Sequence, residues 1–213
     1  MKQLISPTIF ATSIDIYKKK LELLNFSKVI HLDICDGHFV KTKTINLKNS
    51  TDSDFLDHDV EVHLMVEKPL DYLDDCIRLG VFKVFIHREI FFEIGDFIEV
   101  KNSFEKKGIE VALVLNPETQ VENALPFIGQ VNHIMLMSVI PGAEGQSFME
   151  HVLDKVRQIR VLKEDILIQI DGGINLETGK LSLDAGIDVL SVGSFISSSQ
   201  SPKKNFDSLS NLK

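Results

Sequence analysis

Short apolar segments rich in β-branched residues alternate with longer amphipathic segments along the chain. Eight such apolar segments are present, at 4–9, 28–34, 60–66, 82–87, 109–115, 132–138, 166–170 and 188–193. The alternation predicts repeated strand–helix units around a parallel sheet, because buried parallel strands are apolar on both faces and need crossover helices between them. One such helix is expected at 147–162, with one apolar face made of Phe148, Val152, Val156 and Ile159. The fold class expected is α/β, as a (β/α)8 TIM barrel, although strand–helix alternation alone also fits an open doubly wound sheet.

Length and charge limit the kinds of protein that this chain can be. A chain of 213 residues fits one barrel, so a single domain over 1–213 is expected. The formal net charge of −8 and the lack of a long Lys/Arg block give no reason to expect nucleic acid as a partner. The densest basic run, 18–20, falls where a helix is expected, and we interpret it as a solvated helix face.

Several local features bear on location and assembly. No apolar stretch approaches the ~18 residues that span a bilayer, and residues 1–10 lack the apolar region of a signal peptide. We therefore expect no membrane partner, a cytoplasmic location, and reduced thiols at Cys35 and Cys76. Segment 41–58 is polar and predicts a loop with a short helix at the mouth of the barrel. The tail at 197–213 leaves room for only a short last helix, which favours contact with another subunit.

Ionisable residues lie inside apolar strands, near the ends at which barrel active sites are built. His31 and Asp33 are two residues apart on one predicted strand, His63 lies on the next, and Asp171 follows the seventh. A lone strand histidine is more often a core residue than a ligand. Burying two carboxylates and two imidazoles together would cost several kcal/mol per charge without compensation, and a divalent cation is a common partner for such a set. The mixed nitrogen and oxygen ligands suit Zn²⁺, Fe²⁺, Mn²⁺ or Co²⁺ and are too rich in nitrogen for Ca²⁺.

Six segments of the chain carry a resemblance to a known family. They are SPTI at 6–9, HLDICDGHFV at 31–40, VHLMVEKP at 62–69, LNPET at 115–119, PGAEGQSF at 141–148 and IDGGIN at 170–175. From about residue 6 to residue 194 the chain resembles the ribulose-phosphate 3-epimerases, in which these segments fall in the same order. The HxDxxDGHFV and HLMV blocks are specific, because related phosphate-binding barrels lack them. Orotidine-phosphate decarboxylases, for example, carry a lysine between aspartates, and 29–40 contains no lysine.

The resemblance implies an isomerase of the pentose phosphate pathway. Such an enzyme interconverts D-ribulose 5-phosphate and D-xylulose 5-phosphate by proton transfer at C3 through a cis-enediolate. The resemblance assigns His31, Asp33, His63 and Asp171 to one divalent transition metal per chain. It also assigns Asp33 and Asp171 to the acid/base pair, one on each face of the intermediate. A homo-oligomer is implied as well.

The phosphate of the substrate is expected at turns that follow strands six to eight. Glycine-bearing turns occur there at 141–146, 172–173 and 193–194, and glycine lets backbone N–H groups approach an anion closely. The resemblance adds a serine at the end of the first strand and a histidine on the third. The residues expected to contact substrate are Ser6, His63, Gly142, Ala143, Glu144, Gly145, Gly172, Gly173, Gly193 and Ser194.

The chain departs from the family pattern at the mouth of the barrel. Lys41-Thr42 replaces Pro-Asn, and the loop at 140–146 reads IPGAEGQ in place of NPGFGGQ. The carboxylate of Glu144 would oppose a phosphate unless it turns to solvent. Two alternatives therefore stay open, an epimerase of a hexulose phosphate such as allulose 6-phosphate, and a non-catalytic phosphosugar-binding barrel. Intact Asp33 and Asp171 argue against the second, because a binding protein needs no acid on each face of a sugar.

Overall fold

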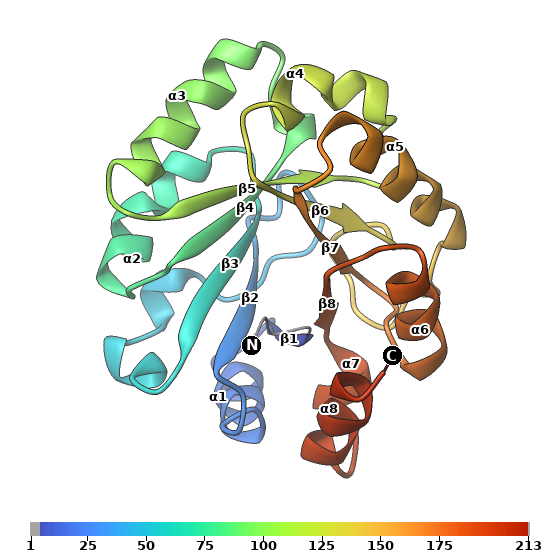
Figure 1. Cartoon of the computed structure of the whole chain (residues 1–213). Coiled ribbons are helices and arrows are strands. Elements are labelled where there is room, and N and C mark those ends of the chain that lie inside the picture. The colour runs from blue at the N-terminus through green and yellow to red at the C-terminus, as the bar shows by residue number, and fades with distance from the viewer. Residues whose placement is uncertain (1–4, 213) are drawn as a thin grey trace.

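Eight parallel strands close into a barrel in the computed structural model, which describes residues 5–212 (Figure 1). In order around the barrel they are β1 (Ile5–Phe10), β2 (Val29–Cys35), β3 (Asp59–Met65), β4 (Lys83–His87), β5 (Glu110–Leu115), β6 (His133–Met137), β7 (Leu167–Asp171) and β8 (Val189–Val192). Pairing of β1 with β8 closes the sheet. The predicted TIM barrel is therefore confirmed and the open sheet is excluded. The predicted strand ends lie within one residue of those observed, apart from residue 4, which lies outside the described residues.

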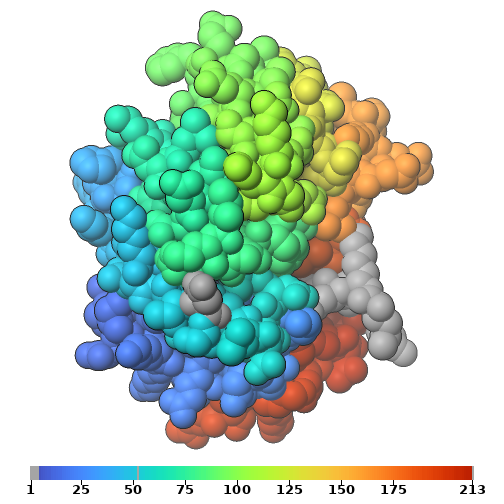
Figure 2. Space-filling view, turned by 90° about the vertical axis from the view of Figure 1, so that its left-hand side faces the viewer, coloured from blue at the N-terminus to red at the C-terminus, as the bar shows by residue number. Residues whose placement is uncertain are grey.

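Helices form a ring outside the barrel (Figure 1). They are α1 (Ile14–Leu23), α2 (Leu73–Arg78), α3 (Ile94–Glu105), α4 (Leu125–Ile128), α5 (Asp154–Leu162), α6 (Leu176–Asp184), α7 (Ser194–Ser197) and α8 (Pro202–Ser210). On the side shown in Figure 2, the first half of the chain forms most of the surface, from α1 at the bottom to α3 at the top. None of the helices in the described part of the chain is long and apolar enough to cross a membrane.

Two segments show how local sequence sets the edges of these elements. The polar segment 41–58 forms the predicted loop, but with two short 3-10 helices, Leu47–Asn49 and Asp52–Phe55, where one short helix was expected. The helix predicted at 147–162 begins later, with a 3-10 turn at Glu150–Leu153 that leads into α5. The preceding residues belong to the loop after β6, because the Met149 N–H donates to the Ser138 carbonyl at 2.8 Å.

Both apolar and polar side chains fill the inside of the barrel. One apolar cluster comes from β4, β5, β6 and the residues just after β6, and it is made of Phe85, Ala112, Val114, Met135, Met137 and Val139. Among the polar side chains, Glu61 on β3 accepts hydrogen bonds from Ser6 on β1 at 2.7 Å and from Gln169 on β7 at 3.1 Å. Glu61 therefore links three of the strands, and two of them also carry His63 and Asp171.

An aromatic cluster anchors the outer layer, and its centre is Phe97 on α3. The Phe97 side chain is fully buried, and its ring centroid lies 5.3 Å from that of Phe91 and 5.4 Å from that of Phe127. Phe97→Ala should lower the free energy of unfolding by about 3–5 kcal/mol, through lost apolar burial and the cavity left behind. Phe92 is 96% exposed, so Phe92→Ala should change the free energy of unfolding by less than about 0.5 kcal/mol. Urea unfolding measures both, and equal losses would contradict this packing.

Candidate metal and substrate site

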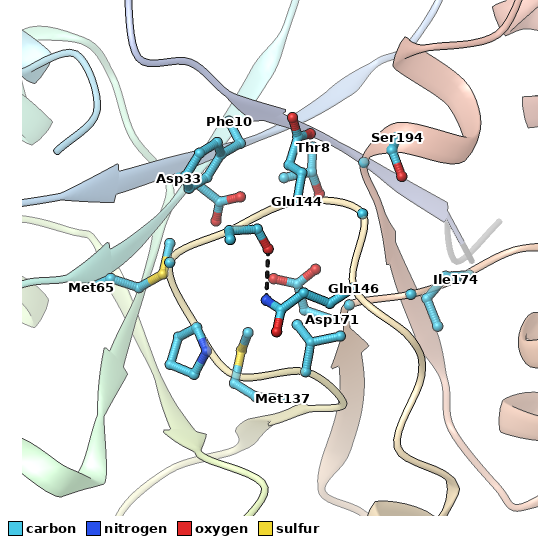
Figure 3. A pocket seen from close by; sticks show the side chains of 18 residues that line it. Thr8, Phe10, Asp33, Met65, Met137, Glu144, Gln146, Asp171, Ile174 and Ser194 are labelled. Atoms are coloured by element: carbon cyan, nitrogen blue, oxygen red, sulfur yellow. Dashed lines mark hydrogen bonds between the residues drawn. The ribbon is translucent and has the colours of Figure 1, made fainter. Parts of the chain in front are cut away.

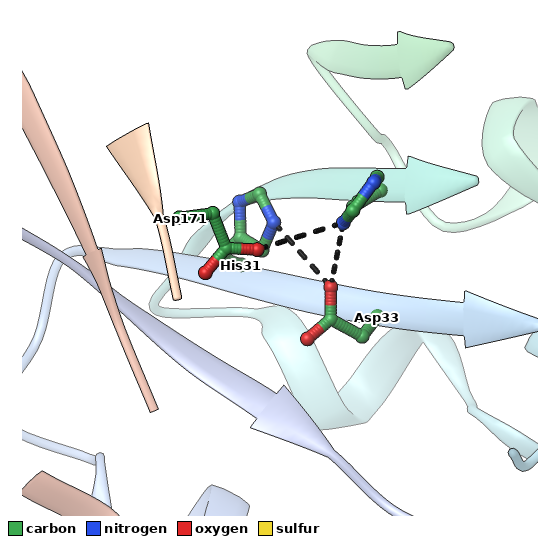
Figure 4. Close-up of side chains that lie close together, drawn as sticks. His31, Asp33 and Asp171 are labelled. Carbon is green, nitrogen blue, oxygen red and sulfur yellow. Dashed lines mark hydrogen bonds and ion pairs between the residues drawn. The ribbon is translucent and has the colours of Figure 1, made fainter. Parts of the chain in front are cut away.

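Four side chains from β2, β3 and β7 meet at the C-terminal end of the barrel (Figure 4). His31 and Asp33 are two residues apart on β2, so both face the barrel interior. The strand register places Asp33 beside His63 of β3, and Asp171 is the last residue of β7. One ligand atom from each residue lies within 4.8 Å of all the others. The structure thus brings together the four residues that the sequence singled out.

The spacing of these atoms fits a metal ion. His31 Nε2 lies 3.6 Å from Asp33 Oδ1, and His63 Nδ1 lies 3.7 Å from Asp171 Oδ2. A tetrahedral zinc ion bound to nitrogen and oxygen requires neighbouring ligand atoms roughly 3.3–3.6 Å apart. The contact between His63 Nδ1 and Asp33 Oδ1, at 2.9 Å, is of hydrogen-bond length. A small outward shift of one side chain would open that contact to the ligand spacing.

His31 is oriented by a carboxylate deeper in the barrel. Its Nδ1 lies 2.7 Å from Glu61 Oε1, so Nδ1–H donates to the carboxylate and Nε2 faces the cluster. The Nε2 atom is buried and has no hydrogen-bond partner. A histidine that donates one ring N–H to a carboxylate and presents the other nitrogen is the usual arrangement of a metal ligand. Glu61 was missed in the sequence, although it lies two residues before His63 inside an apolar strand.

His63 is oriented through a second histidine. Its Nε2 lies 2.8 Å from Nε2 of His87, and His87 Nδ1 lies 3.3 Å from Glu89 Oε2. Glu89 is itself fixed by the Asn116 N–H at 2.9 Å. The chain of contacts leaves His63 Nδ1 directed at the cluster. His87 was also missed, although it is an ionisable residue at the end of a predicted strand.

The charges of the cluster call for a cation. Burial, followed by the charge of Asp33, raises the pKa of Asp171 to about 7. Burial opposes ionisation of Asp33 too, but the His31 and His63 imidazoles outweigh it and lower its pKa to about 2. Burial also disfavours charged His31, yet the Asp33 and Glu61 carboxylates raise the pKa of His31 to about 10. A divalent ion among these groups would compensate the buried negative charge, so the donor set fits a metal.

A cavity lies directly above the cluster (Figure 3). Its empty volume is about 530 Å³, including the part open to solvent. Asp33 and Asp171 face it, whereas His31 and His63 are fully buried and are not part of its lining. The three glycine turns all reach it, through Gly142, Ala143, Glu144, Gly145, Gly172, Gly173, Gly193 and Ser194.

The turn after β7 requires glycine for close packing. Gly172 has φ +114°, and a Cβ there would lie 2.4 Å from Val139 Cγ2. Gly173 has φ +62°, and a Cβ there would lie 2.8 Å from the Phe148 nitrogen. Both backbone conformations and both contacts exclude a larger residue. The turn therefore fits against the loop after β6 and brings the two loops together beside Asp171.

Comparison with known proteins agrees with this geometry. The profile of the Ribulose-phosphate 3 epimerase family matches residues 4–197. The chain belongs to this family. A ribulose-phosphate 3-epimerase of Chlamydia pneumoniae is 34% identical over 209 residues, which cover 91% of this chain and 87% of the relative. One from Bacillus subtilis (strain 168) is 33% identical and covers 82% of each chain.

Solved structures of more distant proteins share the fold of this ribulose-phosphate 3-epimerase family member. KGPDC from Streptococcus mutans superposes with a TM-score of 0.75 at 10% identity, over 100% of this chain and 99% of the other. The 3-hexulose-6-phosphate synthase from Salmonella typhimurium gives a TM-score of 0.74 at 11% identity, over 100% of this chain and 98% of the other. At such identities the likeness supports the barrel fold alone.

Ser6 does not reach the cavity, contrary to expectation. It is the second residue of β1, far from the C-terminal end of that strand, and its hydroxyl donates to Glu61 at 2.7 Å. Thr8 lies two residues further along the same face and does line the cavity. The buried Thr8 Oγ1 has no hydrogen-bond partner. In this ribulose-phosphate 3-epimerase family member, Thr8 therefore takes the place expected for Ser6.

The Glu144 carboxylate is paired with Lys20 although the residue is partly exposed, and the lysine run is not solvated throughout. The Glu144 carboxylate accepts hydrogen bonds from Lys20 Nζ at 2.7 and 2.8 Å. Lys18 and Lys19 are exposed, as expected, but Lys20 is only 9% exposed. Lys20 lies three residues after the fully buried Tyr17, so it shares the inner face of α1. The prediction of a solvated face is therefore wrong for Lys20.

The metal site gives a direct test. Protein purified with its metal should hold about one transition-metal ion per chain, and His31→Ala or His63→Ala should lose most of it, because each removes one of four ligands. His151→Ala removes an exposed histidine and should retain full occupancy. Elemental analysis of the three variants measures this. Full occupancy in both ligand variants would place the metal elsewhere.

Proposed function

We propose that this protein is a ribulose-phosphate 3-epimerase, which interconverts D-ribulose 5-phosphate and D-xylulose 5-phosphate by inverting C3. Membership of the family and the names of its relatives support the reaction. One observation carries the proposal. The carboxylates of Asp33 and Asp171 both face the cavity, and their ligand atoms lie within 4.8 Å of each other and of two histidines.

The two carboxyl groups supply the proton transfers. The C3 hydrogen of the ketopentose lies beside the C2 carbonyl, so its removal gives an enediolate that is planar at C3. We infer that Asp33 is the base and Asp171 the acid for D-ribulose 5-phosphate, as the resemblance to the family implies, and both carboxylates face the cavity. Asp33 takes the proton from one face and Asp171 returns one to the other. Exchange of the two roles gives the reverse reaction.

The metal proposed here is one divalent transition ion per chain. His31, Asp33, His63 and Asp171 would hold it, and when bound it would stabilise the negative charge of the cis-enediolate. The mixed nitrogen and oxygen donors suit Zn²⁺, Fe²⁺, Mn²⁺ or Co²⁺. The buried contacts from Glu61 and His87 keep the two imidazoles in place for this role.

The other end of the substrate is proposed to lie among the glycine turns. Gly142, Gly145, Gly172, Gly173 and Gly193 line that part of the cavity and let backbone approach an anion closely. We propose that the phosphate binds there, beside Ala143 and Ser194, with Asp33 and Asp171 at the C3 end.

We also propose that 1–213 acts as one domain, in the cytoplasm and as a homo-oligomer. The free, buried thiols of Cys35 and Cys76 support a reducing compartment. The short α8, of nine residues, supports contact with a second copy at the C-terminal edge. Light scattering of the purified protein would give the oligomeric state.

A coupled assay tests the proposed function. The metal-loaded protein should form D-xylulose 5-phosphate from D-ribulose 5-phosphate, and a chelator that strips the metal should abolish turnover until metal is restored. Allulose 6-phosphate should turn over more slowly. Preference for allulose 6-phosphate would assign the protein to hexulose phosphates. No turnover of either sugar by metal-loaded protein would indicate a binding protein and contradict the proposal.

A further inference from the structure

A buried lysine reaches the part of the cavity that the glycine turns line. Lys20 Nζ donates to both carboxylate oxygens of Glu144, at 2.7 and 2.8 Å, and to the Phe10 carbonyl at 2.9 Å. Glu144 and Phe10 both line the cavity. Lys20 itself belongs to α1, outside the barrel, and extends over the barrel rim. The ammonium group is therefore fixed just behind the cavity wall.

The Glu144 carboxylate occupies the space between the glycine turns. A Cβ at Gly193 would lie 3.2 Å from Glu144 Oε1 and 3.9 Å from Thr8 Cβ, so these groups surround the same point. Figure 3 shows Glu144 and Thr8 side by side there, with Ser194 nearby. The unpartnered Thr8 hydroxyl and the absence of a Cβ at Gly193 leave polar groups open to a ligand at this point. The carboxylate thus stands where a phosphate of the substrate would lie.

With Glu144 in its present position, the charge at this point disfavours binding of a phosphate. Among the described residues that line the cavity, none is lysine or arginine. A phosphate dianion beside the Glu144 carboxylate would be repelled, because like charges at short range disfavour each other. Lys20 is the cation in contact with that carboxylate. If Glu144 moved away, the ammonium group would be left facing the empty position.

Glu144 is partly exposed, whereas Lys20 is held in place. The Glu144 side chain is 32% exposed and lies between Gly142 and Gly145, which both have positive φ. Rotation outward would return its carboxylate to water without crossing the core. Lys20 is only 9% exposed and keeps its bond to the Phe10 carbonyl.

We propose that Lys20 is the cation that binds the substrate phosphate. The Glu144 carboxylate occupies the phosphate position until the phosphate displaces this carboxylate. The inference rests on the proposed function in taking a phosphorylated sugar as the ligand. The exchange keeps Lys20 paired throughout, since one anion replaces another. Competition from Glu144 lowers the apparent affinity, because only the fraction of molecules with Glu144 displaced binds phosphate.

Calorimetric titration with ribitol 5-phosphate tests this without turnover. This probe carries the phosphate but has no carbonyl, so its binding is measured even if the protein proves not to be an epimerase. Lys20→Met should raise the Kd at least about tenfold, the scale of a charge-assisted hydrogen bond. Glu144→Ala should lower it about threefold or more. Lys19→Met, which removes an exposed lysine one residue away, should leave it unchanged.

The double variant decides between direct and indirect roles of Lys20. In the Glu144→Ala background, Lys20→Met should again raise the Kd about tenfold, because Lys20 contacts the phosphate itself. No effect in that background would mean that Lys20 only neutralises Glu144, and would overturn the proposal. So would weaker binding by Glu144→Ala, or equal affinity of the wild-type protein for ribitol and ribitol 5-phosphate. Glu144→Ala alters a partly exposed side chain, so it remains a test even if Lys20→Met fails to fold.

Discussion

The concentration of buried negative charge at one end of the barrel is the constraint on which the site depends. Asp33, Glu61 and Asp171 are each less than 10% exposed, and the described lining of the cavity above them contains no lysine or arginine. Two histidines and a divalent ion would compensate such a set, and His31 and His63 each have a partner that directs one nitrogen at the cluster. The raised pKa of Asp171 follows from the same crowding.

Two groups of residues at the C-terminal end of the barrel have different proposed roles, in proton transfer and in phosphate binding. Strands β2, β3 and β7 hold the proposed metal ligands, among them the two aspartates proposed for proton transfer, because each side chain is set by the register of a closed sheet. The loops after β6, β7 and β8 form the glycine-lined part of the cavity, where glycine allows close backbone approach. The Lys20–Glu144 pair belongs to this second region and links α1 to the loop after β6. Changes in that pair are expected to alter ligand affinity, and besides burial the Glu144 charge also contributes to the raised pKa of Asp171.

Much of this was predictable from the sequence, for definite physical reasons. Parallel strands are buried on both faces, so their apolar runs marked the strands closely, whereas closure depends on long-range pairing of β1 with β8 that periodicity does not encode. Alternation along β2 was enough to place His31 and Asp33 on one face. Thr8 lines the cavity in place of Ser6 because β1 runs from Ile5 to Phe10, which puts Ser6 near its start. Lys20 is buried because it lies on the inner face of α1. Neither is visible in the residue types alone.

The proposed reaction depends on proton transfer at two faces of the substrate, and hydrogen exchange at C3 tests it most directly. Asp171→Asn and Asp33→Asn should each slow epimerisation by at least ~10²-fold, the scale of a general acid or base. With D-ribulose 5-phosphate in D2O, the Asp171→Asn protein should still incorporate deuterium at C3 of unreacted substrate while forming little D-xylulose 5-phosphate. The Asp33→Asn protein, with equal metal content, should not. Comparable exchange in both variants would indicate one base serving both faces and would contradict the account.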